Sequence, residues 1–311
     1  MKFIQPYTLE TIAALIDCEY VGDPDFEVLG MNEIHVVTPG DIVFVDHPKY
    51  YDKALASNAS VVLINKKVDC PKGKALLISD DPFRDFNSLT SHFKPFQASD
   101  KSISESASIG VGTQIQPNCF IGHNVVIGEN SLIHANVSIF DDTIIGDNVV
   151  IQSGTVLGGN AFYYKKRPEG YDQLKSSGRV IIENDVHIGA SCTIDRGVTG
   201  DTTIGAGSKL DNLIQVGHDT RIGKNCLIAS QAGIAGCCII EDDVTIWGQV
   251  GTNSGITIGS KAVILGQTGV TKSIEGGKTY FGTPIEESRS KLKELALLRK
   301  LPEIIEKLKG E

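Results

Sequence analysis

The feature that most constrains this chain is an aliphatic residue that returns at every sixth position over residues 204–270. A period of six fits neither the 3.6-residue period of an amphipathic helix nor the two-residue alternation of a half-buried strand. Hexapeptide repeats are typical of a parallel β-helix. Glycine, Asn and Asp follow the aliphatic positions, and they tolerate the left-handed backbone angles of tight corners. The repeat positions are Ile204, Leu210, Val216, Ile222, Ile228, Ile234, Ile240, Ile246, Thr252 (the polar substitute), Ile258, Ile264 and Val270.

The same register begins earlier, at Ile103, and holds to Leu157. Residues 160–179 are aromatic, charged and off-period, so we expect a loop that leaves the coil; long loops of this kind usually serve a binding face. The register resumes at Ile182 and slips by four residues at 197–200. In the left-handed form of this fold three hexads make one triangular coil, so residues eighteen apart are expected to stack.

Residues 1–98 lack the six-residue period and alternate short predicted strands with helices. Thr8 is a plausible N-cap for the first helix, and Pro82 stands where helix starts prefer proline. We therefore expect a mainly β protein with three parts. These are a small α/β domain (1–98), a left-handed parallel β-helix (99–282) with the excursion loop 160–179, and C-terminal helices (283–311). Within the first part, strands are expected at 42–45, 60–64 and 75–78, and helices at 49–56 and 82–93.

The C-terminal residues 285–309 have helical spacing, and Pro302 is expected to divide them into two helices. They could cap the last coil, as open solenoid ends require. They could also form a docking surface, whose cations would be Arg289, Lys291, Lys293, Arg299 and Lys300. Because acidic residues are interleaved with these cations, composition alone favours the cap.

Composition excludes several classes of protein. A net charge of −9 argues against a nucleic-acid binder. No run of eighteen apolar residues is present, and the N-terminus lacks the apolar core of a signal peptide. The cysteines show no CxxC spacing and are interpreted as small buried fillers in a reducing cytosol. We therefore predict a cytoplasmic protein with no transmembrane segment and no metal. The cysteines are Cys18, Cys70, Cys119, Cys192, Cys226, Cys237 and Cys238.

His218 is the best candidate for chemistry. Asp211 and Asn212 lie one hexad earlier and Asp219 is adjacent, so a carboxylate could hold one ring nitrogen and raise the basicity of the other. Gly236 follows His218 by eighteen residues and should stack above it. A base below a backbone N–H donor is the arrangement that acyl transfer requires.

A zinc site is the rival interpretation. Some trimeric β-helices are zinc carbonic anhydrases, which use three histidines, two of them five residues apart. In this repeat the closest pair, His123 and His134, is eleven residues apart. Zinc is therefore not expected.

Three segments resemble the UDP-3-O-(3-hydroxyacyl)glucosamine N-acyltransferases of lipid A biosynthesis, and the resemblance covers nearly the whole chain. They are residues 192–202 (C-T-I-D-R-G…G-D-T), 211–218 (D-N-L-I-Q-V-G-H) and 267–274 (Q-T-G-V-T-K-S-I). A fourth stretch, Phe44 to Tyr50, is similar to the family's uridine-binding F-x-x-N-P-K-Y, with His47 at the Asn position.

The resemblance implies a role for each matching residue. His218 would be the general base, Asp211 the carboxylate that orients it, and Gly236 the backbone oxyanion donor. Phe44 and Tyr50 would bracket the uracil. We also count His47 and Asn212 among the substrate-binding residues. A homotrimer with active sites between subunits is implied, and so are C-terminal helices that help to dock an acyl carrier protein, which reverses the preference for a cap.

The expected reaction is direct transfer of a 3-hydroxyacyl chain to the 2-amino group of UDP-3-O-acylglucosamine. The donor would be a phosphopantetheine thioester on acyl carrier protein, and no other cofactor is expected. No covalent acyl-enzyme is expected, because Cys226 and Cys237 lack an adjacent base in the sequence. Two alternatives stay open. The first is an N-acyltransferase that acts on a different nucleotide-linked amino sugar, because His47 and Gly255 both depart from the family pattern. The second is a non-catalytic scaffold that binds a sugar nucleotide.

Overall fold

The computed structural model describes residues 1–309, which form two compact units. The first comprises Met1–Ser99, Asn160–Arg179 and Arg196–Asp201; the second begins with Asp100–Gly159 and Val180–Asp195 and continues from Thr202 onward. The excursion loop thus groups with the N-terminal residues, although it interrupts the coil in the sequence. None of the described helices is long and apolar enough to cross a membrane.

The first unit is built on a six-stranded sheet of order β1-β3-β4-β5-β6-β2, with parallel pairing from β3 to β6 and antiparallel pairing at both edges. All four residues of β5 are buried, as in a strand with both faces covered. The Thr8 hydroxyl accepts from the Thr11 N–H, as its predicted N-cap role requires. Three of these strands, β1 to β3, were not predicted from the sequence. The elements are β1 Lys2–Thr8, α1 Leu9–Leu15, β2 Glu19–Val21, β3 Glu27–Met31, β4 Asp41–Val45, the 3₁₀ helix η1 Pro48–Tyr50, α2 Tyr51–Leu55, β5 Val61–Ile64, β6 Ala75–Ile78 and α3 Pro82–Phe93.

The excursion loop is an ordered hairpin of β16 (Tyr164–Arg167) and β17 (Gly170–Gln173). It belongs to the first unit through both apolar and polar contacts. Ala161 and Leu174 are fully buried in the same apolar cluster as α1 and α3. Arg167 pairs with Asp81 at 2.7 Å, and Lys165 pairs with Asp46 at 2.5 Å. The loop therefore extends the N-terminal fold instead of standing free in solvent.

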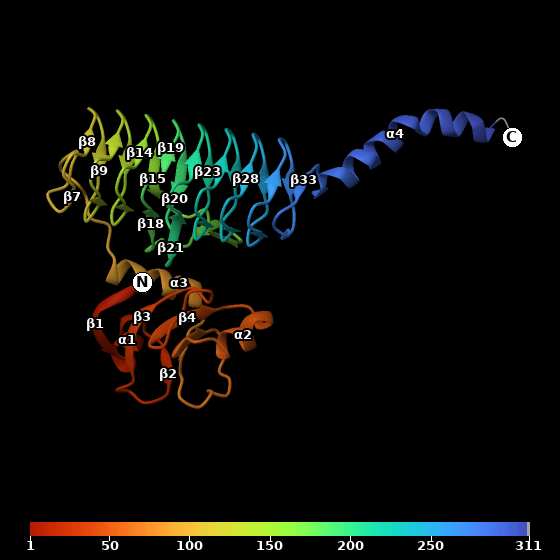
Figure 1. Cartoon of the computed structure of the whole chain (residues 1–311). Coiled ribbons are helices and arrows are strands. Elements are labelled where there is room, and N and C mark those ends of the chain that lie inside the picture. Colours follow the sequence, from red (N-terminus) through yellow and green to blue (C-terminus); the bar gives the residue numbers. More distant parts are fainter. Residues whose placement is uncertain (310–311) are drawn as a thin grey trace. The chain divides into compact units, whose positions relative to one another are not determined.

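The second unit is the predicted left-handed parallel β-helix, with three sheets of eight, ten and eight strands (Figure 1). Residues eighteen apart pair, as Val216 does with Ile234, and the offset becomes 22 across the slip, where Ile188 pairs with Leu210. From Ile121 onward the inward aliphatic residues are almost completely buried, whereas Ile103 and Ile109 at the start of the coil are exposed.

The coil strands fall into the three sheets in regular order. The first contains β7 Ser108–Ile109, β10 Val126–Ile127, β13 Ile144–Ile145, β18 Arg179–Ile182, β21 Asp201–Ile204, β24 Arg221–Ile222, β27 Ile239–Ile240 and β30 Thr257–Ile258. The second contains β8 Gln114–Ile115, β11 Leu132–Ile133, β14 Val150–Ile151, β19 His187–Ile188, β22 Lys209–Leu210, β25 Leu227–Ile228, β28 Thr245–Ile246, β31 Val263–Ile264, β33 Thr279–Phe281 and β34 Glu286–Glu287. The third contains β9 Phe120–Ile121, β12 Ser138–Ile139, β15 Val156–Gly159, β20 Thr193–Asp195, β23 Gln215–Val216, β26 Gly233–Ile234, β29 Gly251–Thr252 and β32 Gly269–Val270.

The C-terminal segment is one helix, α4 (Ser288–Lys309), with Pro302 inside it, so the predicted division into two helices was wrong. Proline removes one backbone hydrogen bond and crowds the carbonyl of Leu298, four residues earlier, but the turns on either side retain theirs. The helix leaves the coil beyond β33 (Figure 1), and none of its described residues is buried. A cap folded over the last coil would bury an apolar stripe, so the structure does not favour that interpretation.

Candidate functional site

His218 stands at the corner that follows β23, and its ring is hydrogen-bonded to the next residue, Asp219. The ring Nδ1 lies 2.9 Å from Asp219 Oδ2, and the two side chains are 12% and 2% exposed. The Asp219 N–H in turn donates to Thr202 Oγ1 at 2.8 Å. Asp219 has the left-handed φ of 57° that aspartate tolerates at a corner. The backbone conformation at the corner thus positions the Asp219 carboxylate, and the carboxylate in turn orients the His218 ring.

The electrostatic surroundings of His218 favour its protonated form. Burial disfavours the imidazolium, but hydrogen bonds and charge interactions with Asp219 and Cys237 outweigh burial and raise the pKa of His218 to about 10. The ring is therefore more basic than an ordinary histidine, because a buried carboxylate stabilises the proton it would accept.

Gly236 lies directly against the His218 ring, as the eighteen-residue register requires. A methyl group added at Gly236 would stand 2.6 Å from His218 Nε2, and one added at Gly217 would stand 2.6 Å from the Gly236 nitrogen. Both contacts are too short for any side chain larger than hydrogen. Two glycines in consecutive coils thus bring a backbone N–H and a histidine nitrogen close together, which is the arrangement that stabilises and deprotonates a tetrahedral intermediate.

A second carboxylate, which the sequence did not single out, interacts with the same histidine. Burial raises the pKa of Asp195 to about 6, against the opposing effects of Gln215 and the charge of His218. Gln215 Nε2 donates to Asp195 Oδ2 at 2.8 Å. Both residues occur in the motifs that carry the resemblance, at Ile194-Asp195-Arg196 and at D-N-x-x-Q. Their pairing depends on the 22-residue offset created by the slip, so the regular repeat gave no signal for it.

Asp211 and Asn212 lie at a different corner of the coil from His218 within this chain. Both follow β22, one corner earlier, and both are exposed. Asn212 Oδ1 accepts the Ala190 N–H at 2.7 Å and so holds its own corner together. Successive corners of a triangular coil point in different directions. Within this chain His218 is hydrogen-bonded to the Asp219 carboxylate, and the orienting role of Asp211 stays a prediction.

The predicted uridine-binding residues line a pocket of about 380 Å³ in the first unit. Phe44 packs against Phe86 with ring centroids 4.8 Å apart, while Tyr50 is 49% exposed. The His47 ring lies 5.8 Å from that of Tyr50, and its Nδ1 accepts the Lys49 N–H at the start of η1. The complete lining is Glu33, Ile34, Phe44, Val45, Asp46, His47, Tyr50, Lys53, Ala54 and Tyr163. Tyr163 comes from the excursion loop, so the loop contributes to this pocket.

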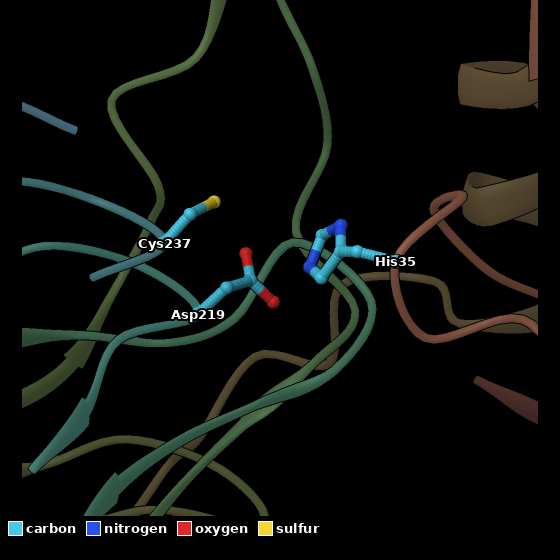
Figure 2. Close-up of side chains that lie close together, drawn as sticks. All are labelled: His35, Asp219 and Cys237. Carbon is cyan, nitrogen blue, oxygen red and sulfur yellow. The ribbon is translucent and has the colours of Figure 1, made fainter. Parts of the chain in front are cut away.

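Cys237 joins the His218 corner through the stacking of the coils. It lies eighteen residues beyond Asp219, and both have left-handed backbone angles. Its sulfur lies within 4.8 Å of an Asp219 carboxylate oxygen, and Figure 2 shows the two side chains together. The Cys237 N–H donates to the His218 carbonyl at 2.7 Å.

Comparison with known protein families gives three matches along the chain. The family described as UDP-3-O-(3-hydroxymyristoyl) glucosamine N-acyltransferase matches residues 25–92. The bacterial transferase hexapeptide (six repeats) matches 106–141 and 201–236, and the hexapeptide repeat of succinyl-transferase matches 179–212. The first match covers most of the N-terminal sheet, and the others cover much of the coil.

Relatives and solved structures agree with these matches. The chain is 40% identical to the UDP-3-O-acylglucosamine N-acyltransferase of Campylobacter lari, over 92% of this chain and 95% of that protein. It is 39% identical to UDP-3-O-acylglucosamine N-acyltransferase 1 of Sulfurimonas denitrificans, over 94% and 98%. The structure of a UDP-N-acetylglucosamine acyltransferase from Bacteroides fragilis matches with a TM-score of 0.55 and 30% identity, over 60% of this chain and 71% of that one. This chain therefore belongs to the UDP-3-O-acylglucosamine N-acyltransferase family and is an acyltransferase.

Proposed function

We propose that this enzyme transfers a 3-hydroxyacyl chain from the phosphopantetheine thioester of acyl carrier protein to the 2-amino group of UDP-3-O-acylglucosamine. The observation that carries the proposal is the Asp219–His218 pair lying against Gly236. The pocket around Phe44 and Tyr50 would bind the uracil. We further propose that the enzyme acts in the cytoplasm as a homotrimer with active sites between subunits. Its domains would be residues 1–98, 99–282 and 283–311.

The chemical step follows from the two nitrogen atoms of His218. Asp219 holds Nδ1, so Nε2 is the atom that takes a proton from the sugar amine. The amine nitrogen gives up this proton as it attacks the thioester carbonyl carbon, and the Gly236 N–H stabilises the resulting oxyanion. The carbon–sulfur bond breaks, and His218 returns its proton to the leaving thiolate. No bond to the enzyme forms.

Mass spectrometry of the product tests this reaction directly. The full-length protein is incubated with UDP-3-O-acylglucosamine and 3-hydroxyacyl carrier protein, and an N-acylated sugar nucleotide is expected. Parallel reactions with other UDP-linked amino sugars address the alternative acceptor. Turnover of one of those in place of UDP-3-O-acylglucosamine would overturn the acceptor assignment, and binding of UDP-sugars without any turnover would favour the non-catalytic scaffold.

Asp219→Asn is expected to change the pH dependence of the reaction. The base works only when His218 has lost its proton, so kcat/KM should rise with pH along a limb that reports the His218 pKa. Asp219 raises that pKa. Removing its charge should therefore move the limb to lower pH by about 1–3 units. The measurement is kcat/KM from pH 5 to 10. Asp243→Asn, at an exposed corner with the same left-handed angle, is the control that should leave the limb in place. An unchanged limb in Asp219→Asn would contradict the pairing.

Charge reversal on α4 tests carrier-protein docking. Arg289, Lys293 and Arg299 are exposed. In the proposal, an acidic acyl carrier protein would bind to these positively charged side chains. Changing all three to Glu should raise KM for the carrier-bound donor about 10-fold, because steering by opposite charge is lost. KM for the same acyl group on free phosphopantetheine should not change. An equal KM for the carrier-bound donor in the triple variant and the wild type would exclude docking through these residues.

Gly251→Leu is expected to shorten the preferred acyl chain. Gly233, Gly251 and Gly269 are register partners on the sheet that contains β23, and nothing lies within 4 Å of a methyl placed at the first two. They leave a strip of bare backbone about 10 Å long, since strands lie about 4.8 Å apart. The leucine side chain would occupy this strip, so a long acyl chain could no longer be buried along it. Each buried CH₂ contributes about 0.8 kcal/mol, so kcat/KM of the variant for long donors should fall about 10-fold or more. Thr245→Leu, at an outward position on another sheet, should leave the chain-length profile unchanged. A Gly251→Leu profile identical to the wild type would remove the acyl chain from this strip.

A further inference from the structure

Cys237 is a thiol placed beside an imidazole that is itself held by a carboxylate. The sequence shows no base near it, because His218 lies nineteen residues away. Coil stacking brings them together: the Cys237 side chain hydrogen-bonds with His218, and its sulfur lies within 4.8 Å of an Asp219 oxygen. A nucleophile, a base and a group that orients the base are the three parts of an activated thiol.

The other thiols have different surroundings. Burial raises the pKa of Cys18 to about 12 and also raises the pKa values of Cys70, Cys192, Cys226 and Cys238. Several of them donate to backbone carbonyl oxygens, as Cys70 does to Lys74 at 3.1 Å. The thiolate is the reactive form of cysteine, so these five are poor nucleophiles.

Cys237 is also accessible, since it is only half-buried at its corner. It directly follows Gly236, whose N–H is the proposed oxyanion donor. A group attached to the sulfur would occupy the space beside the His218 ring. The same position that activates the thiol therefore makes its modification harmful to acyl transfer.

We propose that Cys237 is a covalent modification site for small soft electrophiles and that its modification blocks the acyl-transfer site. With an α-haloamide, the sulfur attacks the CH₂ carbon, a carbon–sulfur bond forms, and the halide leaves. The thiol proton passes to solvent, because His218 already carries a proton at pH 7, and its positive charge stabilises the thiolate. The site of labelling is independent of the proposed function, whereas the loss of activity rests on it.

The experiment treats the full-length protein with limiting iodoacetamide at pH 7 and follows each cysteine by peptide mass spectrometry. Cys237 is expected to react about 10-fold faster than Cys70, which is also half-buried but whose thiol donates to the Lys74 carbonyl oxygen. His218→Gln should slow the labelling of Cys237 by a similar factor while leaving that of Cys70 unchanged. Faster labelling of Cys70 or Cys18 than of Cys237 would overturn the proposal.

Activity is then followed against labelling in matched variants. Cys237→Ser should keep its own untreated rate after exposure to iodoacetamide, whereas Cys70→Ser should be inactivated like the wild type. Equal inactivation of Cys237→Ser and wild type would overturn the blocking role. If instead His218→Ala keeps full activity while Cys237 of the wild-type protein reacts faster than Cys70, the proposed base is wrong and the proposal of a reactive thiol is retained.

Discussion

His218→Ala is expected to lower kcat by at least about 10²-fold, the usual contribution of a positioned general base. The substitution removes Nε2, which takes the amine proton, and removes the hydrogen bond between Nδ1 and the buried Asp219 carboxylate. Substrate binding uses other residues, so KM should change little, and the loss should be confined to the chemical step. Product formation measured by mass spectrometry under single-turnover conditions separates this step from product release.

His187→Ala is the matched control for that variant. His187 is another histidine of the coil, exposed on β19, and its pKa is lowered by burial and by Lys209 instead of being raised by a carboxylate. Surface substitutions of this kind usually change stability by less than about 0.5 kcal/mol. It should retain wild-type turnover. Equal rates for His218→Ala and His187→Ala would show that the base is another group.

Gly236→Ala is expected to reduce kcat by about 10²–10³-fold, comparable with the loss of one oxyanion donor. The added methyl would stand 2.6 Å from Nε2 and about 2.9 Å from the two neighbouring ring carbons, so either the ring or the backbone must move. Either movement separates the base from the N–H donor. Overpacking of this size costs about 1–3 kcal/mol, so the folded protein should persist and its unfolding midpoint can be measured beside its activity.

Gly255→Ala controls for the stability cost of an added methyl. Gly255 lies on the next coil, has a φ of 69° and has nothing within 4 Å of its methyl position. Alanine in that left-handed conformation costs about 1–2 kcal/mol, similar to the cost expected at Gly236. It should lose stability while keeping its kcat. If Gly255→Ala and Gly236→Ala lose activity equally, the loss reflects instability and the contact with His218 is not the cause.

The sequence by itself determined the coil and the partners that regular stacking creates. Each hexad fixes which residue points inward, and the eighteen-residue period fixes which residues stack. The spacing alone therefore pairs His218 with Gly236. The aromatic residues of the pocket, Phe44 and Tyr50, were found by the resemblance of a contiguous stretch. Both signals are local or strictly periodic, so they can be read along the chain.

Only the tertiary structure determined the contacts that do not follow from the six-residue repeat. The hydrogen bond between Asp219 and His218 depends on the direction in which that corner points, and the pairing of Asp195 with Gln215 depends on an irregular offset. The excursion loop is placed by Ala161 and Leu174, which pack into a core that lies far away in the sequence. The continuity of α4 through Pro302 shows that one lost hydrogen bond need not end a helix. Each outcome reflects packing between distant residues, because the energy of such contacts depends on three-dimensional neighbours that spacing in the sequence does not specify.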